Sequence, residues 1–484
     1  MNSATSANVG IPVRTPVLSV ASMRAWERAA WSTGIHESAV IERVGRALAG
    51  WLRERLRDQG RVVLLCGRGH NGDDVRAAVR HLGPLEVREI TVVDPVADLA
   101  RVGEALRDPP DVVVDGLFGI GLNRPLDADW QAIVEKVHAS GCRVVAMDVP
   151  SGLDADTGSV LGAAIIADWT LTVGAPKRGL LTAEAVRHVG RLDVLADVGL
   201  VPWHGGTAAV EGWFGTAAEF MGWPPRRAVD AHKGDFGHVC IVAGSLGFHG
   251  AAVLAARAAL RARPGLVTVI TAPECYVPVA AQLDAAMVMP WSARMALPAN
   301  TTAVVVGPGL ADPGLPAALR EWIANGWRQW TMPVLADASA LDGLPVGAVD
   351  SGALRVLTPH PGEAGRLLGV SAAEIQRDRV AAMQAVSERH GQAVVVLKGS
   401  RTLVGRAGEL PWWNPTGNPG LAQGGSGDVL AGFLGGLLAQ PALAAEAMRA
   451  IRGAVFHHGA AADRLEASGE PWDAADLSRA IRWG

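Results

Sequence analysis

The sequence is poor in cysteine, in excess charge and in long hydrophobic runs, and each shortage excludes a class of protein. Its four cysteines form no CxxC pair, so we expect inert, buried thiols rather than disulfides or a metal site. A formal net charge of −4 gives no general attraction to nucleic acid or to an anionic membrane. We therefore expect neither as a partner, and any phosphate site must be local.

No apolar run is long enough to span a bilayer, and residues 1–14 lack the apolar core of a signal peptide. These absences predict a cytoplasmic protein. Apolar residues, in contrast, make up 49% of the chain, which is enough for full hydrophobic cores. At 484 residues the chain exceeds one core, and two α/β domains are predicted.

Strand-like and helix-like stretches alternate along both halves, beginning with helical periodicity over residues 23–56. Continuous apolar strands of this kind are typical of parallel sheets covered on both faces. The alternation stops around residues 201–222, which places the domain boundary near Gly206 and predicts domains at residues 1–206 and 207–484. The predicted strands are Val62–Leu65, Val87–Val93, Val112–Val114, Val144–Met147, Trp169–Val173, Val239–Val242, Ala303–Val306 and Ala393–Leu397.

Residues 418–430 carry the clearest chemistry, because glycines converge on one carboxylate where an apolar helical pattern begins. Backbone N–H groups of Gly425, Ser426 and Gly427 at a helix N-terminus can form an anion hole for a phosphoryl group, and Asp428 can take a proton from an attacking hydroxyl. A plain glycine loop capped by Asp428 is the alternative. The neighbouring loops favour phosphoryl transfer.

Two loops upstream contain groups suited to phosphate and metal. Prolines fix an extended turn that presents His360 and Glu363 together, and this carboxylate could hold a hydrated magnesium ion. A predicted strand ends at a basic loop of small residues that could hold nucleotide phosphates. This loop consists of Lys398, Gly399, Ser400, Arg401 and Thr402. The loop from Lys398 follows a predicted strand, which is where open α/β sheets place ligands.

The first half has its own loops at strand ends. Residues 66–74 and 115–125 are glycine-bearing loops, and the first of them is a weak phosphate-loop signal when taken alone. Asp148 closes one strand and Lys177 follows another, so an acid and an amine could share protons on a bound ring. The alternative is structural, with Asp148 capping a turn and Lys177 in solvent.

Six motifs occur in order along the second half and cover nearly all of it. They are HKGDFGH from His232, AGSLGFHGAA from Ala243, GPGL from Gly307, LTPHPGE from Leu357, LKGSRT from Leu397 and NPTGNPGLAQGGSGDVLAG from Asn414. Together they resemble the ribokinase-like ADP/ATP-dependent NAD(P)H-hydrate dehydratase family. Two positions depart from it: Ser339, where the family usually carries a second Asp, and His249, where a small hydroxyl residue is more usual.

This resemblance implies repair of NADH or NADPH whose nicotinamide ring has added water. Asp428 would deprotonate the ring hydroxyl of the S hydrate, ADP would phosphorylate it, and loss of phosphate would restore the reduced ring and leave AMP. The residues that would contact the hydrate are Ala251 or Ala252, Gly309 and His360. Gly427 and the loop from Lys398 to Thr402 would contact the adenine nucleotide.

The loops of the first half resemble the NAD(P)H-hydrate epimerase domain, which in many bacteria is fused ahead of the dehydratase. The resemblance covers about residues 20–200. It implies interconversion of the R and S hydrates, with Asp148 and Lys177 as acid–base candidates. A potassium ion would be held by Asn71, Asp115 and Ser151. The dinucleotide would contact His70, Asn71, Gly72, Asp73, Asp74, Gly119, Ile120, Gly121, Leu122, Asn123, Arg124, Pro125 and Asp148.

The first loop departs from this family, which carries consecutive glycines and then Asp-Gly where the chain has Gly72-Asp73-Asp74-Val75. Ile120 also replaces a usual hydroxyl residue. If the loop faces the phosphates, a like-charge contact of Asp73 at about 4 Å costs about 4 kcal/mol at an effective dielectric near 20. Val75 is β-branched and cannot adopt the positive φ that glycine permits. These departures predict a slow or inactive epimerase.

The sequence as a whole predicts a bifunctional nicotinamide-nucleotide repair enzyme with a Rossmann-like N-terminal domain and a ribokinase-like α/β C-terminal domain. Its small-molecule substrate would be hydrated NADH or NADPH, with ADP or ATP, Mg²⁺ and K⁺ as cofactors, and we expect a homo-oligomer. The alternative is a ribokinase-like small-molecule kinase whose N-terminal half is a binding or assembly module without turnover. The two can be distinguished by their products. The repair enzyme would yield free phosphate and restored reduced nicotinamide, whereas the kinase would yield a stable phosphoester.

Overall fold

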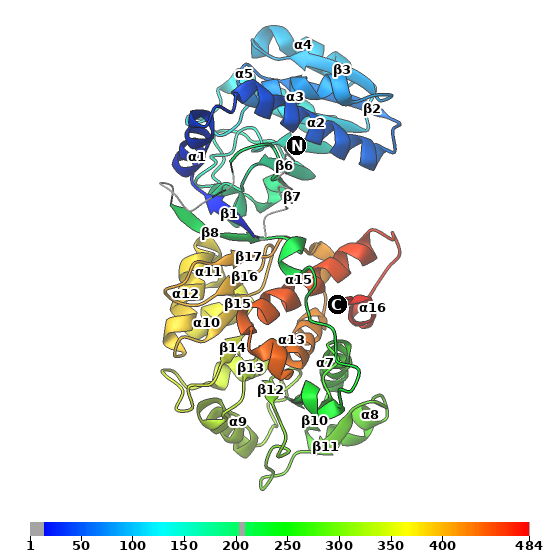
Figure 1. The fold of residues 1–484 in the computed structure, drawn as a ribbon, viewed down its shortest axis with the longest axis vertical. Helices are drawn as coiled ribbons and strands as arrows, with labels where there is room; N and C mark the ends of the chain where they lie inside the picture. Colours follow the sequence, from blue (N-terminus) through cyan, green and yellow to red (C-terminus); the bar gives the residue numbers. More distant parts are fainter. Residues whose placement is uncertain (1–13, 202, 204–208, 484) are drawn as a thin grey trace, which may run out of the picture. The chain divides into compact units, whose positions relative to one another are not determined.

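The computed structural model describes residues 14–201, 203 and 209–483, and the chain divides into two compact units, Met1–Ala218 and Glu219–Gly484 (Figure 1). The boundary predicted near Gly206 lies outside the described residues. Strand β8 (Val210–Gly215) belongs to the first unit, where it pairs antiparallel with β1 (Arg14–Leu18).

The first unit contains a six-stranded parallel sheet in the order β3-β2-β4-β5-β6-β7. The chain moves from β2 to β3 on one side and then to β4 on the other, so the strand order reverses beside β2. Open α/β sheets bind ligands at such a switch point, outside the carboxyl ends of the strands. The strands are β2 (Arg61–Cys66), β3 (Glu86–Thr91), β4 (Val112–Gly116), β5 (Val144–Met147), β6 (Trp169–Val173) and β7 (Arg191–Leu195).

Helices cover both faces of this sheet, because successive strand residues point to opposite faces. Val62 and Leu64 belong to one hydrophobic core with α2 and α3, whereas Val63 and Leu65 belong to a second core with α4 and α5. The helices of the unit are α1 (Val20–Ser32), α2 (Glu37–Leu56), α3 (His70–Ala78), α4 (Pro95–Ala105), α5 (Ala128–Ala139) and the single turn α6 (Val186–Val189).

In the second unit the strands lie in the order β17-β16-β15-β14-β13-β12-β9-β10-β11. The strands from β15 to β11 are parallel to one another, whereas β16 pairs antiparallel with both β15 and β17. Strand β9 is flanked by β10 and β12, which makes a second switch point. The strands are β9 (His238–Val242), β10 (Leu266–Thr271), β11 (Met287–Pro290), β12 (Ala303–Val306), β13 (Val334–Ala336), β14 (Arg355–Leu357), β15 (Val394–Leu397), β16 (Leu403–Gly405) and β17 (Trp412–Trp413).

Helix α13 (Ser426–Leu438) lies at the centre of this unit and packs against α7 and α15 (Figure 1). Its glycines permit the close approach: a Cβ on Gly432 or Gly436 would collide with the backbone of α7, and one on Gly435 would collide with Val305 of β12. The remaining helices are α7 (His249–Arg261), α8 (Tyr276–Ala280), α9 (Ala317–Gln329), α10 (Pro361–Leu368), α11 (Ala372–Arg377), α12 (Arg379–Arg389), α14 (Pro441–Ala444), α15 (Ala447–Glu466) and α16 (Ala474–Ala480).

The predicted α/β class and parallel sheets are confirmed, and β5, β6 and β12 have the predicted bounds. The antiparallel pairs β1–β8 and β16–β17 were not predicted, since strands this short carry little periodicity. All four cysteines are free, and three of them are buried, as expected. Within the described parts of the chain, no helix combines the length and the hydropathy needed to cross a membrane.

Candidate functional site

The N-terminus of α13 presents free donors, as the glycine pattern predicts. Gly425 caps the helix in the left-handed region, with φ +93°. The Ser426 hydroxyl turns back to donate to the Leu421 carbonyl at 2.8 Å, so only the backbone of this residue is left for a ligand. The N–H groups of Ser426, Gly427 and Asp428 have no acceptor among the described residues. The first N–H groups of a helix can bind an anion, and the anion hole stays a prediction.

Asp428 lies in this first turn of α13, and its carboxylate has no hydrogen bond within the described chain. Burial, reinforced by the negative charge of Asp337, raises the pKa of Asp428 to about 7, although Lys398 opposes the shift. A general base is most effective when its pKa lies near the working pH. The structure therefore gives Asp428 the property that the predicted base requires.

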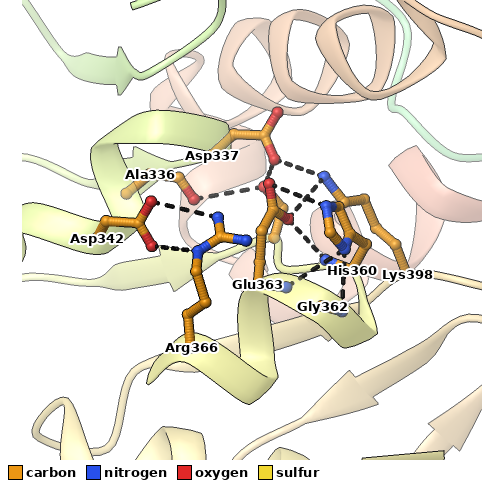
Figure 2. Close-up of polar contacts among 9 residues, drawn as sticks. Ala336, Asp337, Asp342, His360, Gly362, Glu363, Arg366 and Lys398 are labelled. Carbon is orange, nitrogen blue, oxygen red and sulfur yellow. Dashed lines mark hydrogen bonds and ion pairs between the residues drawn. The ribbon is translucent and has the colours of Figure 1, made fainter. Parts of the chain in front are cut away.

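Asp337 is a central residue that the sequence analysis did not assign. It follows β13, and its Oδ1 accepts from the Lys398 ammonium at 2.7 Å and from the Thr358 hydroxyl at 2.7 Å (Figure 2). A Cβ placed on Gly427 would lie 3.8 Å from the other Asp337 oxygen and 3.5 Å from the Lys398 ammonium. Asp337 and Lys398 thus lie at the start of α13. The available signal was the position of Asp337 at the carboxyl end of a buried strand.

Lys398 lies largely inside this cluster, with 19% of its side chain exposed. Burial acts to lower the pKa of Lys398, but Asp337 and Glu363 together raise it above its ordinary value. The ammonium also lies 3.6 Å from Glu363. Its predicted contact with nucleotide phosphates stays a prediction, and any such contact shares the ammonium with Asp337.

His360 and Glu363 form a capping box at the start of α10 (Figure 2). The His360 N–H donates to Glu363 Oε2 at 2.7 Å, and His360 Nδ1 accepts from the Glu363 N–H at 3.3 Å. Because Lys398 already offers this carboxylate its positive charge, direct coordination of a magnesium ion by Glu363 does not fit. No group of three or more His, Cys, Asp or Glu suited to a metal occurs in the described part of the chain. Contact through water stays a prediction.

A buried arginine holds the loop that carries Lys398. The Arg379 guanidinium donates to the carbonyls of Leu397 at 3.0 Å and Lys398 at 3.2 Å, and also to the Ser400 carbonyl. Burial lowers the pKa of Arg379 to about 10. Sequence spacing did not reveal this contact, because α12 and the loop are brought together only by the fold.

Two of the residues predicted to contact the hydrate lie together. Gly309 adopts φ +64°, and a Cβ on it would lie 2.8 Å from the Ala251 side chain. Ala251 is partly exposed, whereas Ala252 is fully buried, so Ala251 is the neighbour that a ligand can reach.

The first unit contains a cavity of about 770 Å³ at the switch point of its sheet. Loops after β2, β4 and β5 line it together with α1. Most of the residues predicted to contact the dinucleotide lie here, and Gly72, Asp73 and Pro125 do not. The predicted residues that line the cavity are His70, Asn71, Asp74, Gly119, Ile120, Gly121, Leu122, Asn123, Arg124, Asp148 and Lys177.

Asp148 and Lys177 form a buried ion pair in this cavity. The Lys177 ammonium donates to Asp148 Oδ1, to the Thr172 hydroxyl at 3.2 Å and to the Val173 carbonyl at 3.0 Å. Asp148 Oδ1 also accepts from the Val173 N–H, while Oδ2 has no partner among the described residues. Since the ammonium has used its three donors, Asp148 Oδ2 is the atom of the pair that is free to accept a proton.

The residues predicted to hold potassium are adjacent. Ser151 donates its hydroxyl and its N–H to the two oxygens of Asp115, at 2.6 and 2.8 Å. Burial raises the pKa of Asp115 to about 6. The amide of Asn71 donates to the Phe118 carbonyl, but its Oδ1 is buried without a partner. A buried carboxylate and an orphaned amide oxygen fit a cation that takes oxygen ligands, and the ion itself stays a prediction.

The expectations for Asp73 and Val75 are wrong. Helix α3 begins at His70, so both residues are helical, and Val75 does not have positive φ. Residues three apart share a helix face, and the Asp73 carboxylate therefore pairs with Arg76 at 2.6 Å instead of facing the cavity. Gly72 is the demanding position, because a Cβ there would collide with the Gly67 carbonyl.

Helix α1 contributes cavity residues that the sequence analysis missed. Burial raises the pKa of Glu27, and burial together with the Asp148 charge raises that of Asp74 well above its ordinary value. The lining arginines form no ion pair or hydrogen bond with any described residue. These arginines are Arg24, Arg28, Arg68 and Arg124. The spacing of Arg24 and Arg28, four apart on one helix, was a usable signal.

Comparisons with known proteins match both units. The NAD(P)H-hydrate dehydratase family model matches residues 239–482, and the model of the YjeF-related protein N-terminus matches residues 37–100 and 85–179. A crystal structure of ADP/ATP-dependent NAD(P)H-hydrate dehydratase from Bacillus subtilis, co-crystallized with ATP/Mg²⁺, is 30% identical with a TM-score of 0.48, covering 53% of this chain and 91% of that chain.

Full-length relatives carry both regions in one chain. The bifunctional NAD(P)H-hydrate repair enzyme Nnr of Coxiella burnetii is 35% identical over 92% of this chain and 94% of its own length. The enzyme of the same name from Escherichia coli is 34% identical over 88% of this chain and 84% of its own. The chain therefore belongs to the family of bifunctional NAD(P)H-hydrate repair enzymes.

Proposed function

We propose that the second unit dehydrates the S hydrate of NADH or NADPH with ADP as the phosphoryl donor. The observation that carries this assignment is the pairing of a carboxyl group whose pKa is about 7 with free N–H groups at one helix N-terminus. A base and an anion site are what phosphoryl transfer to a hydroxyl needs.

In this reaction Asp428 takes the proton of the ring hydroxyl as the hydroxyl oxygen attacks the terminal phosphoryl group. The N–H groups of Ser426 and Gly427 stabilise the charge on the transferred group, and Lys398 lies beside them. The transfer leaves AMP. The ring then loses inorganic phosphate from one carbon and a proton from the adjacent carbon, which restores the double bond of the reduced nicotinamide. Phosphate is a better leaving group than hydroxide, which is the reason for the phosphorylation.

We propose that the first unit interconverts the R and S hydrates. Asp148 Oδ2 takes the hydroxyl proton of the hydrate as one bond of the hydroxyl-bearing ring carbon breaks, and returns that proton when the same bond re-forms on the opposite face. Lys177 holds the other carboxylate oxygen in place. The unpaired arginines of the cavity provide positive charge for the pyrophosphate of the dinucleotide. A potassium ion held by Asn71, Asp115 and Ser151 would supply one more fixed charge. With Asp73 turned away from the cavity, charge repulsion by Asp73 is no longer a reason to expect a slow epimerase, whereas Ile120 does line the cavity.

We further propose a cytoplasmic location, since four free thiols suit a reducing compartment. The homo-oligomeric state and the water-mediated magnesium contact of Glu363 stay predictions from the sequence. No step of the proposed chemistry depends on either of them.

The test is incubation of the purified protein with mixed R and S hydrates of NADH, with ADP and potassium, while the absorbance of reduced nicotinamide is followed. We expect complete conversion with one phosphate released per hydrate. If conversion stops once one epimer has been consumed, the first unit does not interconvert the R and S hydrates. A stable phosphoester without reduced nicotinamide would support the small-molecule kinase instead.

A further inference from the structure

A buried histidine lies behind the donors of α13. His458 lies on α15 with 7% of its surface exposed, and its Nε2 is 2.9 Å from the Ser426 carbonyl oxygen. A carbonyl only accepts hydrogen bonds, so Nε2 carries the proton in this contact. Burial lowers the pKa of His458 to about 4, with the nearby charge of Lys398 acting in the same direction. At neutral pH the ring is therefore neutral and donates through Nε2.

The bonded carbonyl belongs to the same peptide unit as the Gly427 N–H. The peptide group is planar and trans, so its C=O and N–H point in opposite directions, and fixing one fixes the other. A donor on the oxygen also polarises the amide, which makes its N–H a stronger donor, because hydrogen bonds in a chain reinforce one another. The hydrogen bond from His458 to the Ser426 carbonyl should therefore strengthen the binding of an anion by the Gly427 N–H.

The position of α15 is itself determined by contacts with the loop that leads into α13. Thr416 donates its hydroxyl to the Phe456 carbonyl at 2.8 Å, and Asp463 accepts from the Gly417 N–H at 3.0 Å. A Cβ on Gly459 would collide with the Thr416 hydroxyl. One face of α15 therefore holds the loop, and His458 holds the first turn of the helix that follows.

We propose that His458 is a positioning residue of the anion hole, which orients and polarises the Ser426–Gly427 peptide so that the Gly427 N–H binds the transferred phosphoryl group. The inference rests on the proposed dehydratase function of the second unit. His457 is the matched control, since it directly precedes His458 on the same helix. Its ring packs against Phe220 and Phe456 and not against the N–H groups at the start of α13.

The first test compares His458→Met, His458→Gln and His457→Met in the full-length protein with ADP and the S hydrate. Loss of one oxyanion donor costs about 10²–10³-fold in kcat, so loss of its support in His458→Met should cost about 10-fold, with little change in KM for the hydrate. His458→Gln keeps an N–H donor and should recover most of the rate. Equal kcat in His458→Met and His457→Met, or no recovery with Gln, would overturn the proposal.

The second test needs no variant. In protein labelled with ¹⁵N-histidine, His458 should be the neutral tautomer with its proton on Nε2 between pH 6 and 8. In protein labelled with ¹⁵N-glycine, addition of inorganic phosphate should shift the Gly427 amide resonance. A proton on Nδ1, or an unmoved Gly427 amide, contradicts the proposal. If the unmodified protein releases no phosphate from hydrate and ADP, the proposed function fails, whereas the tautomer and the amide shift still decide the role of His458.

Discussion

The two candidate sites treat one type of side chain in opposite ways. Asp148 in the first unit receives three donors on one oxygen, including a buried ammonium. Asp428 in the second unit receives none from the described residues, and its pKa rises to about 7 through burial. Environment, rather than residue type, therefore decides whether a carboxylate is held by a fixed cation or titrates near neutrality. Each of the following predictions tests one side of this comparison.

The largest effect is expected at the carboxylate without donors. Asp428→Asn keeps the shape of the side chain but removes the proton acceptor, so kcat for dehydration should fall about 10²–10⁴-fold while ADP still binds. Stopped assays of phosphate release and calorimetry with ADP measure the two quantities. Asp342→Asn changes an exposed carboxylate paired with Arg366 and serves as the control. Near-normal turnover in Asp428→Asn would falsify its role as the base.

The paired carboxylate should respond through stability as well as activity. Lys177→Met leaves Asp148 without its ammonium in a site where Lys177 is 1% exposed, and breaking a buried pair costs about 3–5 kcal/mol. Hydrogen exchange of peptides from the first unit, measured in urea, reports this loss locally. The double variant with Asp148→Asn should regain part of the stability and none of the epimerisation. Unchanged exchange in Lys177→Met would mean that the pair is not buried in solution.

Val75 tests the corrected account of the first loop. The side chain is fully buried against β2 and β4, and the residue is helical. Val75→Gly should destabilise the first unit by about 3 kcal/mol, from the lost burial and the low helix propensity of glycine. Val75→Ala removes the burial alone and should cost less. Faster epimerisation by Val75→Gly, without loss of stability, would restore the interpretation drawn from the sequence.

Dehydration should depend on pH through Asp428. Because the base must be ionised, kcat/KM should rise about tenfold per pH unit below pH 7 and level off above it. Asp337→Asn removes a negative charge that raises the pKa of Asp428, so the midpoint should move to lower pH. A midpoint that stays fixed, or moves upward, would show that Asp337 does not face the base.

The sequence predicted well those features that neighbouring residues determine. Short runs of apolar and β-branched residues predicted the bounds of β5, β6 and β12, and the glycines before Asp428 marked the start of α13. Features that depend on contacts between distant segments were missed. Asp337 and Lys398 meet because β13 and β15 lie on either side of β14. The two residues are 61 positions apart in the chain, and no periodicity in the intervening sequence indicates the pair.

The errors at α3 have a different cause. A glycine and two carboxylates after a strand were interpreted as an extended loop, although the same residues satisfy the first turn of a helix. Asp at the start of a helix is favoured by the helix dipole, and Val75 packs into the core only if the helix has already begun. Local composition could not distinguish the two, whereas the packing of α3 against α2 and β2 does.

The smallest effect is expected at Asp73, where the sequence predicted a like-charge contact costing about 4 kcal/mol. Its side chain is 40% exposed and pairs with Arg76, and exposed pairs contribute about 0–1 kcal/mol. Asp73→Gly should therefore change the rate of epimerisation of purified R hydrate, in potassium without ADP, by less than about twofold, with a loss of stability of about 1 kcal/mol from glycine in a helix. Arg76→Gln removes the same ion pair by changing its other member, and its rate of epimerisation should equal that of Asp73→Gly. A tenfold gain with Asp73→Gly alone would place this carboxylate against the dinucleotide, and α3 would then have to begin later than His70 when substrate is bound.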